Sequence, residues 1–115
     1  MSTRWQIAAQ LSDGQFACIY VHCDGYPSYA LATLKEHYTE QSKIDRLIAL
    51  GDCLSIGKDL DQCDPFSSRK DEDQEEIKAS FGASLKDAAH KHLHGDEEYR
   101  YFWDGGSWEE ASFEQ

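Results

Sequence analysis

Between residues 16 and 38, the spacing of hydrophobic side chains changes from the alternation of a β-strand to the period of an α-helix. Over residues 16–22, FACIYVH, the side chains of Ala17, Ile19 and Val21 fall on one face of a strand. The opposite face carries more polar groups, so we expect the Ala17 face to point toward the core.

A turn and a helix are predicted to follow this strand directly. The segment 24–27, DGYP, is rich in turn-forming residues, and we expect Gly25 to adopt the positive φ that a sharp reversal needs. Ser28 is a candidate N-cap. Leu34 and Tyr38 lie on one apolar stripe of the helix that follows. The sequence therefore predicts a strand–turn–helix corner.

The rest of the chain adds a partner strand, two more helices and a closing hairpin. We expect strands at residues 4–10 and 16–22, helices at 28–38, 43–50 and 84–94, and strands at 98–103 and 107–113. This ββ–αα–loop–α–ββ order predicts an α+β fold. In it, the N- and C-terminal hairpins join in an antiparallel sheet, and about three helices pack on one face.

Length and composition favour one folded domain over residues 1–115. The chain is 40% hydrophobic and contains three Trp, six Tyr and five Phe, which supply apolar area for a single core. Residues 65–76, PFSSRKDEDQEE, carry few apolar groups and are expected to form a mobile acidic loop. The N-terminus lacks an apolar signal core and no run approaches the length of a membrane span, so a cytoplasmic location is expected.

The net charge of −11 is unevenly distributed along the chain. Residues 1–58 hold six acids and five bases, a balance of −1, and residues 59–115 hold sixteen acids and six bases, a balance of −10. Such a charge repels nucleic-acid backbones, so direct binding to DNA or RNA is disfavoured. A basic protein that handles nucleic acid is the partner that this charge fits.

One group of acidic residues is the candidate partner-binding surface. It consists of Asp59, Asp61, Asp64, Asp71, Glu72, Asp73, Glu75 and Glu76. Carboxylates spread over a folded surface can imitate the phosphates of DNA and occupy a basic channel, with release of ions from both partners. A solvated loop explains the same run of charge.

Three histidines in the segment HKHLH offer metal ligands. If the third helix continues to Gly95, His90 and His94 lie one turn apart and could share a metal ion, while His92 points to the opposite side. A metal-binding protein that uses His90 and His94, with His22 or His37 and a cysteine, is therefore an alternative. A solvated helix end accounts for the same residues, so our first hypothesis contains no metal and no other cofactor.

The neighbouring residues His22, Cys23 and Asp24 do not predict a catalytic site. Adjacent side chains on a strand point to opposite faces, so they cannot form a hydrogen-bonded triad by adjacency. Asp24 is also the residue type that a turn favours. We expect no catalytic residues, and we expect the four cysteines to be free thiols because no secretory signal accompanies them.

Three segments carry a resemblance to a known family: IYVHCDGYPS, LKEHY and LIALGD. With these motifs the chain resembles a family of small proteins carried by phages, prophages and other mobile elements. In that family a strand ending in Y-x-H-x-D-G-Y-P precedes a helix ending in H-Y and a second helix ending in L-G-D. The segment EYRYFWDGGSW is similar to the closing hairpin of the family. The resemblance covers most of the chain apart from residues 59–79.

The resemblance implies a mobile-element origin and an intracellular accessory or counter-defence role. Together with the charge, it leads to the first hypothesis: a non-enzymatic protein that blocks a basic, nucleic-acid-handling host protein, as anti-CRISPR and anti-restriction proteins do. A structural protein is a further alternative. It would form a homodimer through exposed aromatic side chains, namely Tyr99, Tyr101, Trp103 and Trp108.

Overall fold

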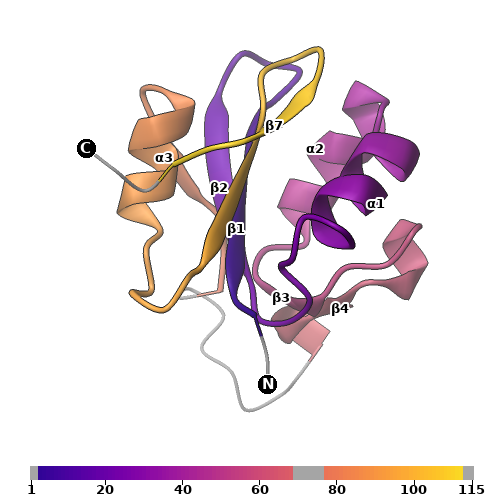
Figure 1. The fold of residues 1–115 in the computed structure, drawn as a ribbon. Coiled ribbons are helices and arrows are strands. Elements are labelled where there is room, and N and C mark those ends of the chain that lie inside the picture. The colour runs from indigo at the N-terminus through magenta and orange to yellow at the C-terminus, as the bar shows by residue number, and fades with distance from the viewer. Residues whose placement is uncertain (1–2, 69–76, 113–115) are drawn as a thin grey trace.

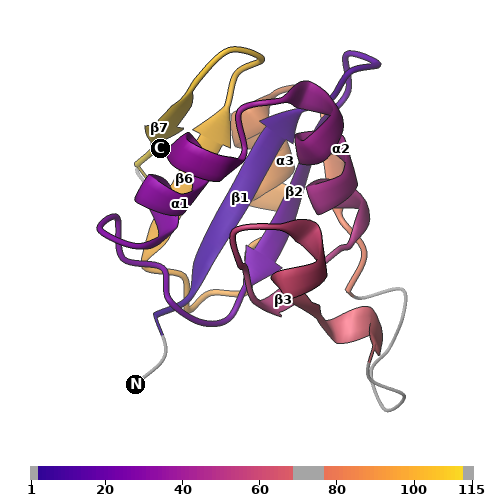
Figure 2. The ribbon, with the colours of Figure 1, turned by 90° about the vertical axis from the view of Figure 1, so that its right-hand side faces the viewer.

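A mixed β-sheet with helices on both faces forms the protein (Figures 1 and 2). The computed structural model describes residues 3–68 and 77–112. Its strands are β1 (Trp5–Gln10), β2 (Phe16–Val21), β3 (Cys53–Ser55), β4 (Asp64–Pro65), β5 (Ser80–Gly82), β6 (Tyr99–Trp103) and β7 (Trp108–Glu110). Its α-helices are α1 (Ala30–His37), α2 (Gln41–Ala49) and α3 (Leu85–Lys91). The predicted α+β class is therefore confirmed.

The prediction of an antiparallel sheet is wrong, because two of the strand pairings are parallel. The strands follow the order β4-β3-β2-β1-β6-β7, and β5 pairs with β2. The hairpins β1–β2 and β6–β7 are antiparallel as expected, but β6 runs parallel to β1 and β3 runs parallel to β2. After α3 the chain returns to the end of the sheet at which β1 begins. Tyr99 therefore pairs with Trp5, and β1 and β6 start side by side.

The prediction that all helices share one face of the sheet is also wrong. Helices α1 and α2 cover one face, and α3 covers the other (Figures 1 and 2). The larger core lies between the sheet and the first two helices, where the buried Ala17, Ile19 and Val21 of β2 meet α1 and α2. On the opposite face, Ala8 and Cys18 contact two alanines of α3. Small side chains on both surfaces allow α3 to approach the sheet closely.

Two polar side chains fix α3 and β6 to this second face. Gln6 is fully buried, and its side-chain amide donates a hydrogen bond to the carbonyl of Ala89 at 3.0 Å. The Nε of Arg100 donates to the Gln6 side-chain oxygen at 2.9 Å. A buried amide that is satisfied on both sides links sheet and helix in one arrangement.

The corner after β2 uses its turn residues differently from the prediction. Asp24 adopts the positive φ, at 67°, and Gly25 does not. Gly25 is required instead for close packing, because a Cβ at this position would lie 2.8 Å from the carbonyl oxygen of Thr3 and 2.8 Å from the Trp5 ring. The carbonyl of Gly25 also accepts a hydrogen bond from the Tyr101 hydroxyl at 2.6 Å.

Helix α3 begins as predicted but ends early. The Ser84 hydroxyl accepts from the backbone N–H of Asp87 at 3.0 Å, so Ser84 is the N-cap at the start of the helix predicted over residues 84–94. The helix ends at Lys91, and the C-cap residue His92 has left the helical conformation. Residues 92–95 therefore do not continue the helix, and the side chain of Leu93 is 42% exposed.

The aromatic side chains of the closing hairpin lie mostly in the core. Tyr101, Trp103 and Trp108 are buried, and Tyr99 is half-buried. The exposed aromatic face proposed for a homodimer is therefore not present on this hairpin. A homodimer through another surface stays untested.

No helix in residues 3–68 and 77–112 is both long and apolar enough to cross a lipid bilayer. None of the four cysteines forms a disulfide, as predicted. Cys18 and Cys53 are buried, and Cys23 and Cys63 are partly exposed.

Candidate metal centre

The carboxylate of Asp52 lies at the centre of a buried polar cluster. Asp52 follows Gly51, where α2 stops at a positive φ of 78°, and its backbone N–H donates to the carbonyl of Ile77. Its side chain is 2% exposed. One carboxylate oxygen, Oδ1, accepts from the backbone N–H of Tyr20 on β2 at 2.9 Å. Sheet and helix together hold this carboxylate in place.

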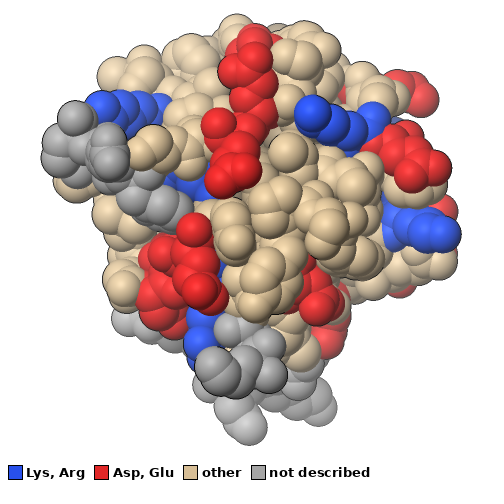
Figure 3. Space-filling model, in the orientation of Figure 1, with Lys and Arg blue, Asp and Glu red and all other residues tan. Residues whose placement is uncertain are grey.

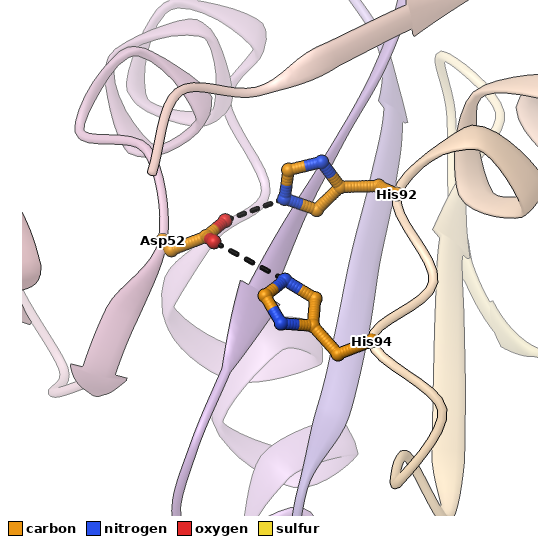
Figure 4. Close-up of side chains that lie close together, drawn as sticks. All are labelled: Asp52, His92 and His94. Carbon is orange, nitrogen blue, oxygen red and sulfur yellow. Dashed lines mark hydrogen bonds and ion pairs between the residues drawn. The ribbon is translucent and has the colours of Figure 1, made fainter. Parts of the chain in front are cut away.

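Two histidines from the segment after α3 converge on this carboxylate (Figure 4). The Nε2 of His92 lies 2.6 Å from Asp52 Oδ1, and the Nε2 of His94 lies 3.4 Å from Oδ2. One ligand atom from each of these three residues lies within 4.8 Å of the others. His92 is 5% exposed and His94 40% exposed, so the cluster extends from the interior to the surface.

Further contacts orient each of the two imidazoles. The Nδ1 of His92 lies 2.6 Å from the Ser80 hydroxyl on β5. The ring of His94 stacks on the ring of Tyr20 at 4.0 Å between centroids. Glu97 accepts from the backbone N–H groups of His94 and Gly95, both at 2.8 Å, and so fixes the turn that carries His94.

A second group of polar side chains lies beside the cluster, around the hydroxyl of Tyr20. The Tyr20 hydroxyl lies 3.1 Å from the Nδ1 of His22 and 3.4 Å from Asp96. Arg4 is 3.3 Å from the carboxylate of Asp96. Tyr20 thus joins the two groups, because its backbone N–H contacts Asp52 and its ring contacts His94.

The electrostatics of the cluster favour a charged Asp52 and a protonated His94 when no cation is bound. Burial raises the pKa of the Asp52 carboxyl, but hydrogen bonds from His92 and His94 outweigh burial and hold it below its ordinary value. The hydrogen bond to Asp52 raises the pKa of His94 above 6.5, against the opposing effect of partial burial. Asp52 is therefore an anion that a cation or a proton must balance.

A surface hollow gives access to the two histidines. It has a volume of about 330 Å³ and is lined by Lys78, Ala79, Ser80, Lys91, His92, Leu93 and His94. A metal site needs such an entry path, and a site that retains free coordination positions needs space beside the ion.

Two imidazoles and one carboxylate are a ligand set for a divalent transition metal such as zinc. Zinc binds such ligands at about 2.0–2.2 Å, so two ligand atoms of a tetrahedral ion are about 3.4 Å apart. The 3.4 Å between the Nε2 of His94 and the Oδ2 of Asp52 matches this distance. The Nε2 of His92 lies 2.6 Å from the other oxygen, Oδ1, so these two atoms share a hydrogen bond and would have to move apart around an ion.

The same residues include a chain of hydrogen bonds from Asp52 through His92 to Ser80. A carboxylate, a base and a hydroxyl in this order also occur at nucleophilic active sites. That interpretation uses only one of the two histidines. The convergence of His94 on the second carboxylate oxygen favours a metal centre, because a metal uses all three side chains.

Of the predicted pair of metal ligands, His90 and His94, only His94 lies in this cluster. His90 is exposed on α3 and is not part of the cluster, since the helix ends before His94. His92, which the helical prediction placed on the opposite side, takes its place. His22 contacts Tyr20 and His37 contacts Glu36, so neither joins the three ligand atoms. Asp52 had no local signal that marked it as a ligand.

The predicted partner-binding acids are described only in part. Asp59 forms an ion pair with Lys43 at 3.1 Å, Asp61 lies on a short 3₁₀ turn, and Asp64 begins β4. Five of the predicted residues lie outside the described chain: Asp71, Glu72, Asp73, Glu75 and Glu76. On the face shown in Figure 3, acidic side chains form separate groups with uncharged and basic side chains between them.

Comparison with known proteins leaves the function to be argued from the site. No protein-family model, no curated protein and no solved structure matches this chain. The resemblance to a mobile-element family stays a prediction.

Proposed function

We propose that this protein binds one divalent transition-metal ion, with zinc as the best fit, through Asp52, His92 and His94. The observation that carries the proposal is the convergence of both Nε2 atoms on the two oxygens of one buried carboxylate. Imidazole nitrogen and carboxylate oxygen are ligands that zinc accepts, and three protein ligands leave at least one position for water or a substrate.

The surroundings of the site support this function in two ways. Outer contacts orient ligands as they do at known metal sites, with Ser80 on His92 and the Tyr20 backbone N–H on Asp52. The net charge of −11 also creates a field that attracts cations. A hydrogen-bonded core cluster is the competing account, since the described buried side-chain polar atoms all have partners without an ion.

Metal analysis of the purified protein separates these two accounts. We expect about one equivalent of zinc per chain, removal by a chelator, and a melting temperature that rises with zinc concentration as mass action requires. A protein that contains no metal, and whose melting temperature does not respond to zinc, manganese or cobalt ions, would identify the cluster as a structural ion pair.

A second candidate function uses the acidic half of the chain. In this proposal the protein is a mobile-element accessory factor that blocks a basic, nucleic-acid-handling host protein in the cytoplasm. The charge of −10 in residues 59–115 favours it. Reversal of Asp71, Glu72, Asp73, Glu75 and Glu76 to lysine should abolish capture of the partner from nuclease-treated host lysate at low salt. Capture that survives this reversal would exclude the acidic segment as the binding surface.

A further inference from the structure

Ser80 holds the side of His92 that faces away from Asp52. The Ser80 Oγ lies 2.6 Å from the Nδ1 of His92, while the Nε2 of the same ring lies 2.6 Å from Asp52. The two ring nitrogens thus have partners from different parts of the chain, because Ser80 belongs to β5 and Asp52 lies just before β3. These two contacts fix the plane of a ring that is 5% exposed.

The chemistry of imidazole makes the Ser80 contact important for a metal. A neutral imidazole carries one proton, and a nitrogen that binds a metal must offer its lone pair. If Nε2 binds the ion, the proton lies on Nδ1 and needs an acceptor in this buried place. The serine hydroxyl can supply one, since it accepts as well as donates. Without an ion, the same hydroxyl can donate to Nδ1 while Nε2–H donates to Asp52.

We infer that Ser80 is a positioning residue of the metal centre: its hydroxyl accepts the Nδ1 proton of His92 and so keeps Nε2 free for a divalent ion. This inference rests on the proposed function. Ser80 can follow both states of His92, because rotation of one hydroxyl changes it from donor to acceptor. A residue without a hydroxyl would leave the Nδ1–H of the loaded protein buried and unpaired.

Zinc titrations of four proteins test this role. Ser80→Ala should weaken zinc binding by about 10- to 100-fold, the usual effect of losing an outer hydrogen bond to a metal ligand. Ser80→Thr keeps the hydroxyl and suits a strand, so it should bind within about threefold of the wild type. The matched control is Ser28→Ala, which removes the hydroxyl of an exposed serine outside the cluster.

The possible results distinguish this inference from the proposed function. Zinc binding to Ser80→Ala with wild-type affinity overturns the inference and leaves the metal centre intact. Equal losses in Ser80→Ala and Ser80→Thr overturn it too, because the hydroxyl would then not be the determinant. If the wild type binds no zinc, the metal centre and the role of Ser80 fall together.

A spectrum of the unsubstituted protein tests the same point if the alanine variant does not fold. In a long-range proton–nitrogen correlation spectrum of the zinc-loaded wild type, His92 should carry its proton on Nδ1 and bind zinc through Nε2. A proton on Nε2, with zinc bound through Nδ1, overturns the role of Ser80.

Discussion

The carboxylate of Asp52 and the imidazole of His92 are 2.6 Å apart, although forty positions of sequence separate the two residues. Both side chains are almost completely buried, and His94 contacts the second oxygen of the same carboxylate. Two chain segments that show no common pattern thus supply a site together.

The contribution of His94 to stability should depend on pH in metal-free protein. Because its pKa is raised by folding, protonation favours the folded state. The contribution is complete below the unfolded pKa of about 6.5 and is lost as pH rises through the folded value. Asp52 has a lowered pKa, so its contribution is present above about pH 4 and is lost in more acidic solution. The pair therefore contributes most at about pH 5–6.

Urea unfolding of the chelated wild type and of His94→Gln checks this window. The difference in unfolding free energy between the two proteins should be larger at about pH 5.5 than at about pH 9. A difference that stays constant or grows toward pH 9 would show that protonated His94 does not stabilise the fold.

Substitution of Gly25 should destabilise the protein because of packing rather than backbone conformation. In Gly25→Ala, the new methyl group would meet Trp5 and the Thr3 carbonyl at 2.8 Å, which should cost about 1–3 kcal/mol of unfolding free energy. Asp24→Gly is the control, at the position with positive φ. It should stay within about 0.5 kcal/mol of the wild type, since relief of the left-handed conformation and the greater freedom of unfolded glycine oppose each other. The reverse order of effects would contradict this account of the corner.

The buried side chain of Gln6 should be essential for the attachment of α3. Gln6→Met preserves the approximate volume of the side chain. It removes the amide N–H that donates to the Ala89 carbonyl and the amide oxygen that accepts from Arg100. We expect a loss of about 1–3 kcal/mol, because buried polar groups lose their partners. Gln15→Met, at an exposed turn, should change stability by less than about 0.5 kcal/mol. Equal effects of the two substitutions in chemical denaturation would contradict this role.

Local patterns predicted the elements of this fold better than their arrangement. The alternation in β2 correctly placed Ala17, Ile19 and Val21 in the core, and Ser84 correctly marked the start of α3. The parallel pairing of Trp5 with Tyr99 has no local signal, since it depends on the path of the whole chain. The position of α3 depends on two small side chains, Ala8 of β1 and Cys18 of β2. Side chains of this size do not show in the sequence which face of the sheet a helix will cover.

The candidate site could be predicted only in fragments. The segment HKHLH offers candidate metal ligands. A helix that continues to Gly95 would place His90, rather than His92, beside His94. The helix ends at Lys91 because tertiary contacts draw His92 inward to Asp52 and Ser80, and no glycine or proline marks that end. In the segment beyond the helix, His92 and His94 both lie near one carboxylate. The sequence signal for this cluster was the spacing of two residues between His92 and His94, rather than the spacing of four between His90 and His94.

Isothermal titration with zinc of the metal-free wild type, His94→Ala and His90→Ala tests the central claim most directly. The two variants remove the same side chain four positions apart, but only His94 contacts Asp52. We predict one ion per wild-type chain, an affinity about tenfold or more weaker in His94→Ala, and an unchanged affinity in His90→Ala. No zinc binding by the wild type, or an equal loss in His90→Ala, would contradict a metal centre formed by Asp52, His92 and His94.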